Sequence, residues 1–108
     1  MARNDLQGSL DLPVLKTFSQ IGEVHGYGIV SHIQTASNEL LNVEEGSLYP
    51  ALHRTEQSGW ISAEWALTET NRRAKYYKLT TSGKKELQEA EKSFEQLVKG
   101  VRAIIRYA

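Results

Sequence analysis

Residues 47–80 read SLYPALHRTEQSGWISAEWALTETNRRAKYYKLT, and the spacing of their apolar residues changes half-way along. In the first half, Leu48 and Leu52 lie four residues apart, which places them on one face of an α-helix. In residues 60–67 apolar and polar residues then alternate, as in a half-buried β-strand. After a polar turn, residues 72–79 predict the returning strand. The stretch therefore predicts a helix followed by an antiparallel β-hairpin.

The ends of this helix are marked by residues with capping preferences. Ser47 is a good N-cap, and Ser58-Gly59 supplies a left-handed C-terminal stop. Pro50 then falls in the first turn, the part of a helix that tolerates proline. We therefore expect a helix from Ser47 to Ser58, with an outer surface that carries Tyr49, His53 and Arg54.

A first helix is expected over residues 10–21, where apolar residues recur at helical spacing. Ser9 or Asp11 is its expected N-cap, and Gly22 stops it. The side chains expected to face the core are Leu10, Val14, Leu15, Phe18 and Ile21.

A second helix is expected over residues 26–36. Gly26 and Gly28 weaken helicity at its start, so we expect them to permit a close approach of the backbone. Residues 37–45 predict an irregular connector or a brief extended piece. The face expected to be buried comprises Ile29, Ile33 and Ala36.

The order of elements predicts the fold. Thr80 or Thr81 caps a final helix that runs to the C-terminus. Three helices, a hairpin and a further helix form a winged helix-turn-helix, in which the hairpin is the wing. The expected fold class is mainly α with a small β-hairpin (α+β). We expect a winged helix-turn-helix DNA-binding domain in residues 1–80 and a long dimerisation helix in residues 81–108.

The final helix carries an apolar stripe that predicts dimerisation. As a helix, residues 84–107 would be about 36 Å long, too long to bury the whole stripe against so small a domain. The alternative is that the stripe packs on the first helix of the same chain. We expect a twofold homodimer, the commonest oligomer. The heptad positions are Leu87, Ala90, Phe94, Leu97, Val101, Ile104 and Ala108, and the stripe is widened by Val98 and Ile105.

Composition excludes several other classes of protein. The chain has 108 residues and no cysteine, which rules out disulfides and thiolate metal sites. No apolar run approaches the length of about 20 residues that spans a membrane, and the N-terminus does not resemble a secretion signal. We therefore expect a cytoplasmic protein without a membrane partner. The three histidines lack the spacing of a metal site, and no catalytic arrangement is recognisable, so we expect no cofactor and no enzyme activity.

Positive charge gathers at the predicted wing although the net charge of the chain is zero. Residues 70–85 contain no acid and carry the basic side chains of Arg72, Arg73, Lys75, Lys78, Lys84 and Lys85. Such a patch beside a recognition helix favours DNA over the alternative of a solvated charged face. It also favours DNA binding over a winged-helix module for protein interaction. A further alternative is a ligand sensor whose DNA contact is secondary, which an apolar pocket in the dimer would distinguish.

The candidate DNA contacts lie on two elements. A recognition helix places its N-terminal residues in the major groove, and the wing can neutralise phosphates or enter the minor groove. The alternatives are core packing for Tyr49 and a solvated charge for Arg54. The recognition helix supplies Ser47, Tyr49, Pro50, His53 and Arg54, and the wing supplies Arg72, Arg73 and Lys75.

Four segments together strongly resemble the PadR family of bacterial repressors, over residues 8–90. The segments are LDLPVLKTF (10–18), EVHGYGI (23–29), VEEGSLYPALHRTEQSGWISAEW (43–65) and NRRAKYYKLTTSGKKEL (71–87). The single C-terminal helix is similar to that of the family's smaller members. The chain departs from the family at Pro13, where an aliphatic residue is usual.

The resemblance implies a homodimer that binds double-stranded DNA at a palindromic operator and represses transcription. It places Ser47, Tyr49, Arg72, Arg73 and Lys75 at the DNA, and Tyr27 where the second helix meets the backbone. Some relatives release DNA when a phenolic acid or hydrophobic drug binds, so the resemblance also implies a small hydrophobic or phenolic inducer. The last helix lacks the tryptophan with which some drug-binding relatives stack planar ligands.

Overall fold

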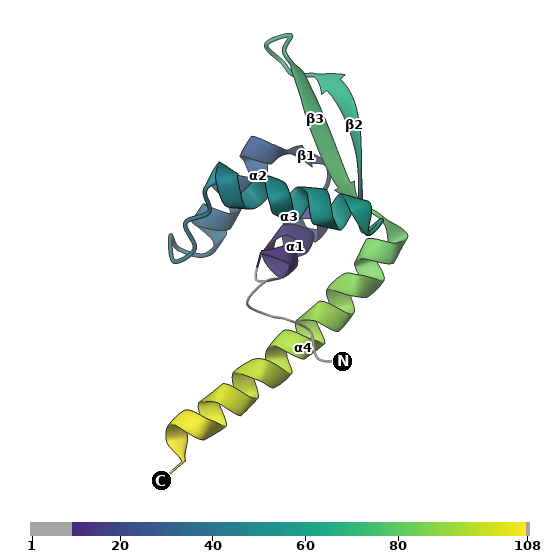
Figure 1. Ribbon diagram of the computed structural model, residues 1–108. Helices are drawn as coiled ribbons and strands as arrows, with labels where there is room; N and C mark the ends of the chain where they lie inside the picture. Colours follow the sequence, from purple (N-terminus) through teal and green to yellow (C-terminus); the bar gives the residue numbers. More distant parts are fainter. Residues whose placement is uncertain (1–9, 108) are drawn as a thin grey trace.

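The computed structural model describes residues 10–107, which form four helices and a three-stranded antiparallel sheet (Figure 1). The order of elements is α1 (Asp11–Ile21), β1 (Val24–His25), α2 (Gly26–Ala36), α3 (Glu45–Gln57), β2 (Ile61–Leu67), β3 (Arg73–Leu79) and α4 (Thr81–Arg106). The predicted fold class, mainly α with a small sheet and a long C-terminal helix, is confirmed. No helix within residues 10–107 is both long and apolar enough to cross a membrane.

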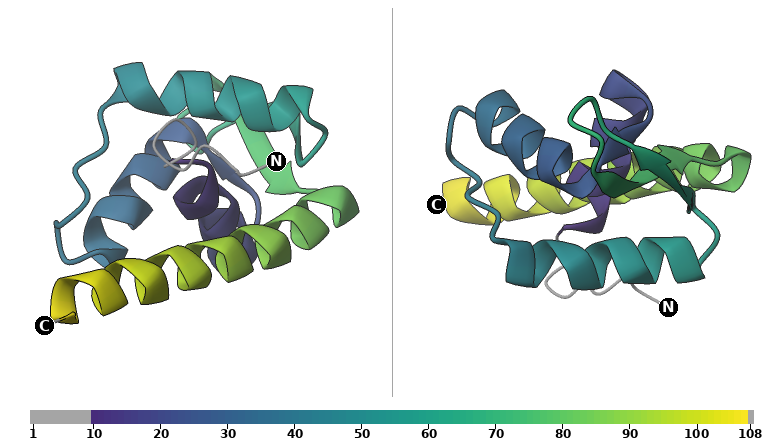
Figure 2. Two further views of the ribbon diagram at one scale, coloured as in Figure 1. Left: turned by 60° about the horizontal axis from the view of Figure 1, so that its bottom comes forward. Right: turned by 90° about the horizontal axis from the view of Figure 1, so that it is seen from above.

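Helix α1 is the centre of the domain. It packs against α2, α3, β3 and α4, and both further views show it between α3 and α4 (Figure 2). The buried apolar side chains include Val14, Leu15, Phe18, Ile29, Ile33, Leu48, Leu52, Ile61, Tyr77 and Leu87. Two expected core residues are instead exposed, Ile21 and Ala36, because each is the last residue of its helix and extends beyond the elements that would cover it.

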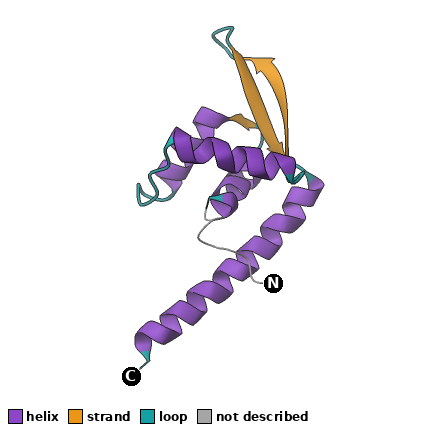
Figure 3. Cartoon of the chain, viewed as in Figure 1, coloured by secondary structure: helices purple, strands orange, loops and turns teal. Residues whose placement is uncertain are grey.

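The sheet has one strand more than the sequence predicts, and its order is β1-β3-β2 (Figure 3). Strands β2 and β3 pair as the expected hairpin, from Ile61 opposite Leu79 to Leu67 opposite Arg73. The additional strand β1 pairs with β3 through only two residues. A strand of two residues is too short to show an alternating pattern in the sequence. Its formation depends on pairing with β3.

Helix α3 begins three residues earlier than expected, because its N-cap is Glu44 and not Ser47. Its first residue is Glu45, and its N-cap, Glu44, makes no side-chain capping bond. Ser47 already lies inside the helix, and its amide N–H donates to the Glu44 carbonyl at 3.0 Å. Pro50 therefore lies in the second turn, where its missing N–H leaves the Gly46 carbonyl unbonded within the helix. Gly46 is exposed, so water can satisfy that carbonyl.

The predicted end of α3 and start of α4 are confirmed. Gly59 has a φ of 79°, and its N–H donates to the Glu56 carbonyl, which closes α3. Thr80 caps α4, since its hydroxyl oxygen accepts from the Gly83 N–H at 2.9 Å. The same hydroxyl donates to the Gly59 carbonyl at 2.6 Å. One side chain thereby joins the end of α3 to the start of α4.

The predicted close approach at the start of α2 is also confirmed. A Cβ on Gly28 would overlap the side chain of Val24, and a Cβ on Gly26 would lie 3.5 Å from the ring of Tyr49. The absence of side chains at these glycines lets the first turn of α2 lie against both neighbours.

The apolar stripe of α4 divides into a covered part and an open part. Leu87 and Ala90, assigned above to the dimer seam, are each only 6% exposed because they pack in the core of their own chain. The alternative of packing on α1 is therefore correct for the first turns. The stripe is exposed at Phe94, Leu97, Val101, Ile104 and Ile105, while Val98 is half-buried. Ala108 lies outside the described residues.

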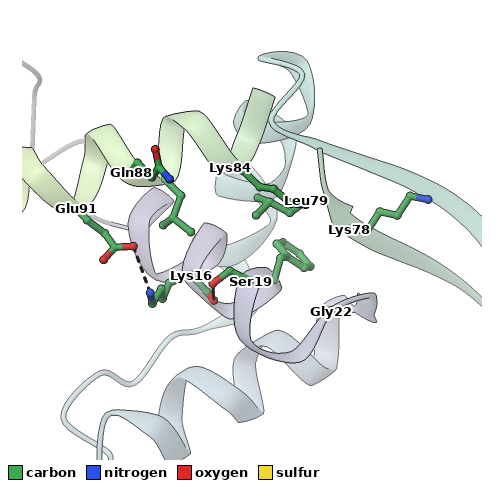
Figure 4. Close-up of a pocket in the computed structure, with 10 residues that line it drawn as sticks. Lys16, Ser19, Gly22, Lys78, Leu79, Lys84, Gln88 and Glu91 are labelled. Atoms are coloured by element: carbon green, nitrogen blue, oxygen red, sulfur yellow. Dashed lines mark hydrogen bonds and ion pairs between the residues drawn. The ribbon is translucent and has the colours of Figure 1, made fainter. Parts of the chain in front are cut away.

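Two ion pairs tie α1 to its neighbours and differ in burial. Arg54 of α3 donates from Nη2 to Oδ1 of Asp11 at 2.9 Å, and the Asp11 side chain is only 16% exposed. Asp11 is thus the first residue of α1 and a partner of α3, and Leu10, without a side-chain bond, occupies the N-cap position instead. The other expected cap, Ser9, lies outside the described residues. In the second pair, Lys16 meets Glu91 of α4 at 3.3 Å, with both side chains nearly half exposed (Figure 4).

We expect Asp11→Ala to lower the free energy of unfolding by about 1–2 kcal/mol, because it leaves the half-buried Arg54 without its partner. Arg54 Nε already has no hydrogen-bond partner among the described residues. Lys16→Ala is the control and should cost less than about 1 kcal/mol, since its ion pair is exposed. Urea unfolding followed by circular dichroism measures both, and equal losses would contradict the distinction.

Candidate nucleic-acid interface

Helix α3 presents one side to the core and another to solvent. Leu48, Ala51, Leu52 and Thr55 are buried, and this alternation follows the helical period. Four of its predicted DNA contacts are exposed, namely Ser47, Tyr49, Pro50 and His53. Tyr49 is 51% exposed, so its ring is not a core side chain.

The fifth predicted contact on α3, Arg54, is placed differently. Its guanidinium bonds Asp11 of α1, which draws the side chain towards the core side of the helix. Arg54 therefore anchors α3 to α1 and lies apart from the exposed residues around Tyr49.

The wing turns one face towards α3. Strand side chains alternate between faces, so Trp65 and Leu67 share the face of β2 that begins with the buried Ile61. Arg73 and Lys75 lie opposite Leu67 and Trp65 on β3, and so they belong to the same face. The hairpin rises beyond the helices (Figure 1), which leaves the outer part of this face uncovered.

An open hollow forms where α2, α3 and the wing meet. It brings together four residues predicted separately as DNA contacts, Tyr27, Tyr49, Arg73 and Lys75. Its remaining lining includes the exposed ring of Trp65, which strand alternation places on the apolar face of β2 and which is not among the predicted DNA contacts. Alternation identified that face correctly, but it could not show that the hairpin is longer than the domain that covers it.

The three wing cations occupy different environments. Arg73 stacks over Trp65, with its Cζ 5.1 Å from the ring centroid. Lys75 pairs with Glu56 of α3 at 3.2 Å and lies 5.5 Å from the ring centroid of Tyr77. Arg72 lies at the hairpin turn, where its side chain is exposed and has no partner within residues 10–107. Lys75 therefore joins the wing to α3, whereas Arg72 is free to extend.

Tyr77 forms part of the wall below Lys75 and packs on Phe18, with ring centroids 6.3 Å apart. Burial raises the pKa of Tyr77 above its ordinary value of 10.0, and nearby Lys75 only partly opposes this effect. A phenol is neutral at physiological pH even at its ordinary pKa, so Tyr77 adds no negative charge to the hollow that it lines with Arg73 and Lys75.

Metal chemistry has no candidate site in this part of the chain. Residues 10–107 contain no group of three His, Asp or Glu side chains that could hold a metal ion. Two histidines serve local structure: His25 Nδ1 accepts from the Gly28 N–H at the start of α2, and His32 bonds Gln20.

Comparison with known proteins explains this arrangement of helices and wing. Residues 14–89 match the Transcriptional regulator PadR-like family. The chain belongs to the PadR family. This PadR-family protein is 33% identical over 79 residues to Transcriptional regulator Rv3488 of Mycobacterium tuberculosis, a match that covers 73% of the chain and 70% of that protein.

Two further relatives support the assignment. The Negative transcriptional regulator PadR of Bacillus subtilis is 32% identical over 66 residues, which is 61% of this chain but only 36% of that longer protein. The structure of a transcriptional regulator from Clostridium thermocellum superposes with a TM-score of 0.84 at 27% identity, over 96% of this chain and all of the other. This PadR-family protein is thus a DNA-binding transcriptional regulator, and its relatives are regulators rather than enzymes.

Proposed function

We propose that this PadR-family regulator is a homodimeric repressor that grips a palindromic operator with α3 and the wing of each protomer. The observation that carries the proposal is the hollow in which Tyr27, Tyr49, Arg73 and Lys75 converge from three elements. One strand of the DNA duplex, passing between α3 and the wing, would contact all four residues. A repressor of this kind acts in the cytoplasm, where bacterial DNA lies.

The contacts divide by the chemistry of the side chains. Exposed α3 residues suit the base edges of the major groove, where serine hydrogen-bonds and a tyrosine ring packs on thymine methyl groups. The wing arginines suit phosphates. Arg54 supports α3 through Asp11 instead. The proposed DNA-facing set is Tyr27, Ser47, Tyr49, Pro50, His53, Arg72, Arg73 and Lys75.

The proposed dimer uses the open part of the α4 stripe. Helix α4 has 26 residues and is about 39 Å long, and its far half extends away from the domain, at the opposite end from the wing tip (Figure 1). Its heptad side chains Phe94, Leu97, Val101 and Ile104 are exposed at the spacing that pairs helices. We therefore divide the protein into a DNA-binding domain in residues 1–80 and a dimerisation helix in 81–108, whose first turns complete the core of the domain.

Twofold symmetry would place the recognition helices on successive turns of one DNA face, with half-sites about 34 Å apart or a multiple of that distance. The name of the Bacillus subtilis relative supports negative regulation. The apolar surface between paired α4 helices is where a small hydrophobic or phenolic inducer would bind to change this spacing.

The test removes the two wing arginines. We expect Arg72→Ala combined with Arg73→Ala to weaken DNA binding about tenfold or more, because two charge-assisted contacts are lost. The negative slope of log K against log salt should become shallower by about 2. Each phosphate contact that is removed means that binding releases one counterion fewer. Fluorescence anisotropy with an operator selected from random DNA measures both quantities.

The control is Lys92→Ala combined with Lys99→Ala, which removes equal charge from exposed positions on α4 away from the apolar stripe. This variant should keep the wild-type affinity and salt slope. An unchanged slope in the wing variant would refute the proposed interface.

A further inference from the structure

Trp65 is a large apolar side chain on the part of the wing that lies outside the hydrophobic core. It is 59% exposed on the outer part of β2, although burial of a tryptophan side chain would stabilise the fold. Its register partner on β3 is Lys75, and Leu67 faces Arg73. Trp65 and Arg73 are therefore diagonal neighbours on one face of the hairpin, within reach of long side chains.

The contact between them constrains Arg73 without using its hydrogen-bond donors. The guanidinium carbon lies 5.1 Å from the centroid of the Trp65 ring, a cation–π distance. The contact is to the π face of the ring, and the Arg73 side-chain N–H groups donate no hydrogen bond to any other residue within 10–107. Those N–H groups remain available for the paired, charge-assisted bonds that guanidinium makes to phosphate.

We infer that Trp65 is a positioning residue that holds Arg73 over the hollow, ready to bind a phosphate of the DNA backbone. The inference rests on the proposed DNA interface and adds a specific role for a residue of the hollow that is not among the predicted DNA contacts. The hollow supports it directly, because Trp65 and Arg73 line the wing side while Tyr27 and Tyr49 line the helix side. A DNA strand that enters would thus find the Arg73 side chain already ordered.

The physical effect is a reduced loss of side-chain entropy on binding. A long cationic side chain that is ordered only when it meets DNA loses conformational freedom at that moment, which lowers affinity about three- to tenfold. Arg72 offers an internal comparison, since it lies at the turn with no side-chain partner within residues 10–107. Trp65 should therefore affect the energetics of Arg73 and leave those of Arg72 unchanged.

The experiment is a double-mutant cycle on DNA affinity with Trp65→Ala, Arg73→Ala and the combined variant. We expect Trp65→Ala to weaken binding about three- to tenfold with an unchanged salt slope, because Arg73 still reaches its phosphate. Arg73→Ala should make the negative salt slope shallower by about 1. In the Arg73→Ala background, Trp65→Ala should have no further effect. Trp65→Phe keeps a ring face and should restore most of the affinity.

A spectroscopic measurement checks the contact in the free protein. The chain has two tryptophans, so Trp60→Phe leaves Trp65 as the only indole. We expect Arg73→Ala to shift the emission of Trp65 in this background, and Arg72→Ala to leave it unchanged. Because Trp65 is exposed, Trp65→Ala should keep the thermal unfolding midpoint of the wild type.

Three outcomes would overturn the inference. Wild-type affinity in Trp65→Ala would show that Trp65 has no role in binding. A loss that persists in the Arg73→Ala background would show that Trp65 contacts DNA itself. Unchanged Trp65 emission in the Arg73→Ala variant would show that the two side chains do not stack in solution. Failure of the proposed interface is distinguishable, because Arg73→Ala would then leave affinity and salt slope unchanged.

Discussion

Gly83→Ala is expected to be among the most destabilising single substitutions in this protein, with a loss of about 3 kcal/mol in the free energy of unfolding. Gly83 is buried in the first turn of α4, and a Cβ there would overlap the backbone carbonyl oxygen of Trp60. It would also lie 2.8 Å from Cδ1 of Leu79. The Trp60 carbonyl cannot move freely, because it accepts a hydrogen bond from the Thr80 N–H at 3.0 Å.

The control is Gly100→Ala in the same helix. Nothing lies within 4 Å of a Cβ at Gly100, so alanine should stabilise the helix by about 1 kcal/mol through its higher helix propensity. Thermal and urea unfolding at one fixed protein concentration measure both variants, since the stability of a dimer depends on concentration. Equal stability of Gly83→Ala and the wild type would show that α4 does not meet the Trp60 carbonyl as described.

Val101→Asp is expected to convert the regulator to monomers and to lower operator affinity about 100-fold or more. Val101 is 44% exposed in the protomer, so the aspartate would be hydrated there and the monomer should fold. In the proposed dimer the same carboxylate would be buried against apolar side chains without a partner. Loss of the second half-site then removes the gain of about 10²- to 10⁴-fold that linked binding provides.

Ala103→Asp is the matched control, because it adds the same charge to an exposed position of α4 outside the heptad stripe. It should remain dimeric and bind operator with wild-type affinity. Sedimentation velocity at micromolar concentration and a mobility-shift titration report the two properties. A dimeric Val101→Asp variant would place the interface elsewhere on the chain.

Much of the candidate DNA interface was predictable from sequence. The recognition helix, the wing and its arginines followed from a change in hydrophobic period and a run of basic residues. Three features were not predictable: the attachment of Arg54 to Asp11, that of Lys75 to Glu56, and the stacking of Arg73 on Trp65. Each contact joins side chains on two different elements, so it depends on how those elements are placed in space, which residue types alone do not encode.

The sequence by itself determined the elements whose formation depends on neighbours in the chain. The end of α3 at Gly59, the cap of α4 at Thr80 and the hairpin were all readable, since positive φ, capping bonds and strand alternation are local properties.

Only the tertiary structure decided which apolar side chains of each element are buried by other elements and which stay exposed. It placed Leu87 in the core and left Phe94 open, and it created β1 by pairing two residues with β3. Burial and pairing of this kind depend on segments that are distant in sequence, and packing between such segments overrides local preference.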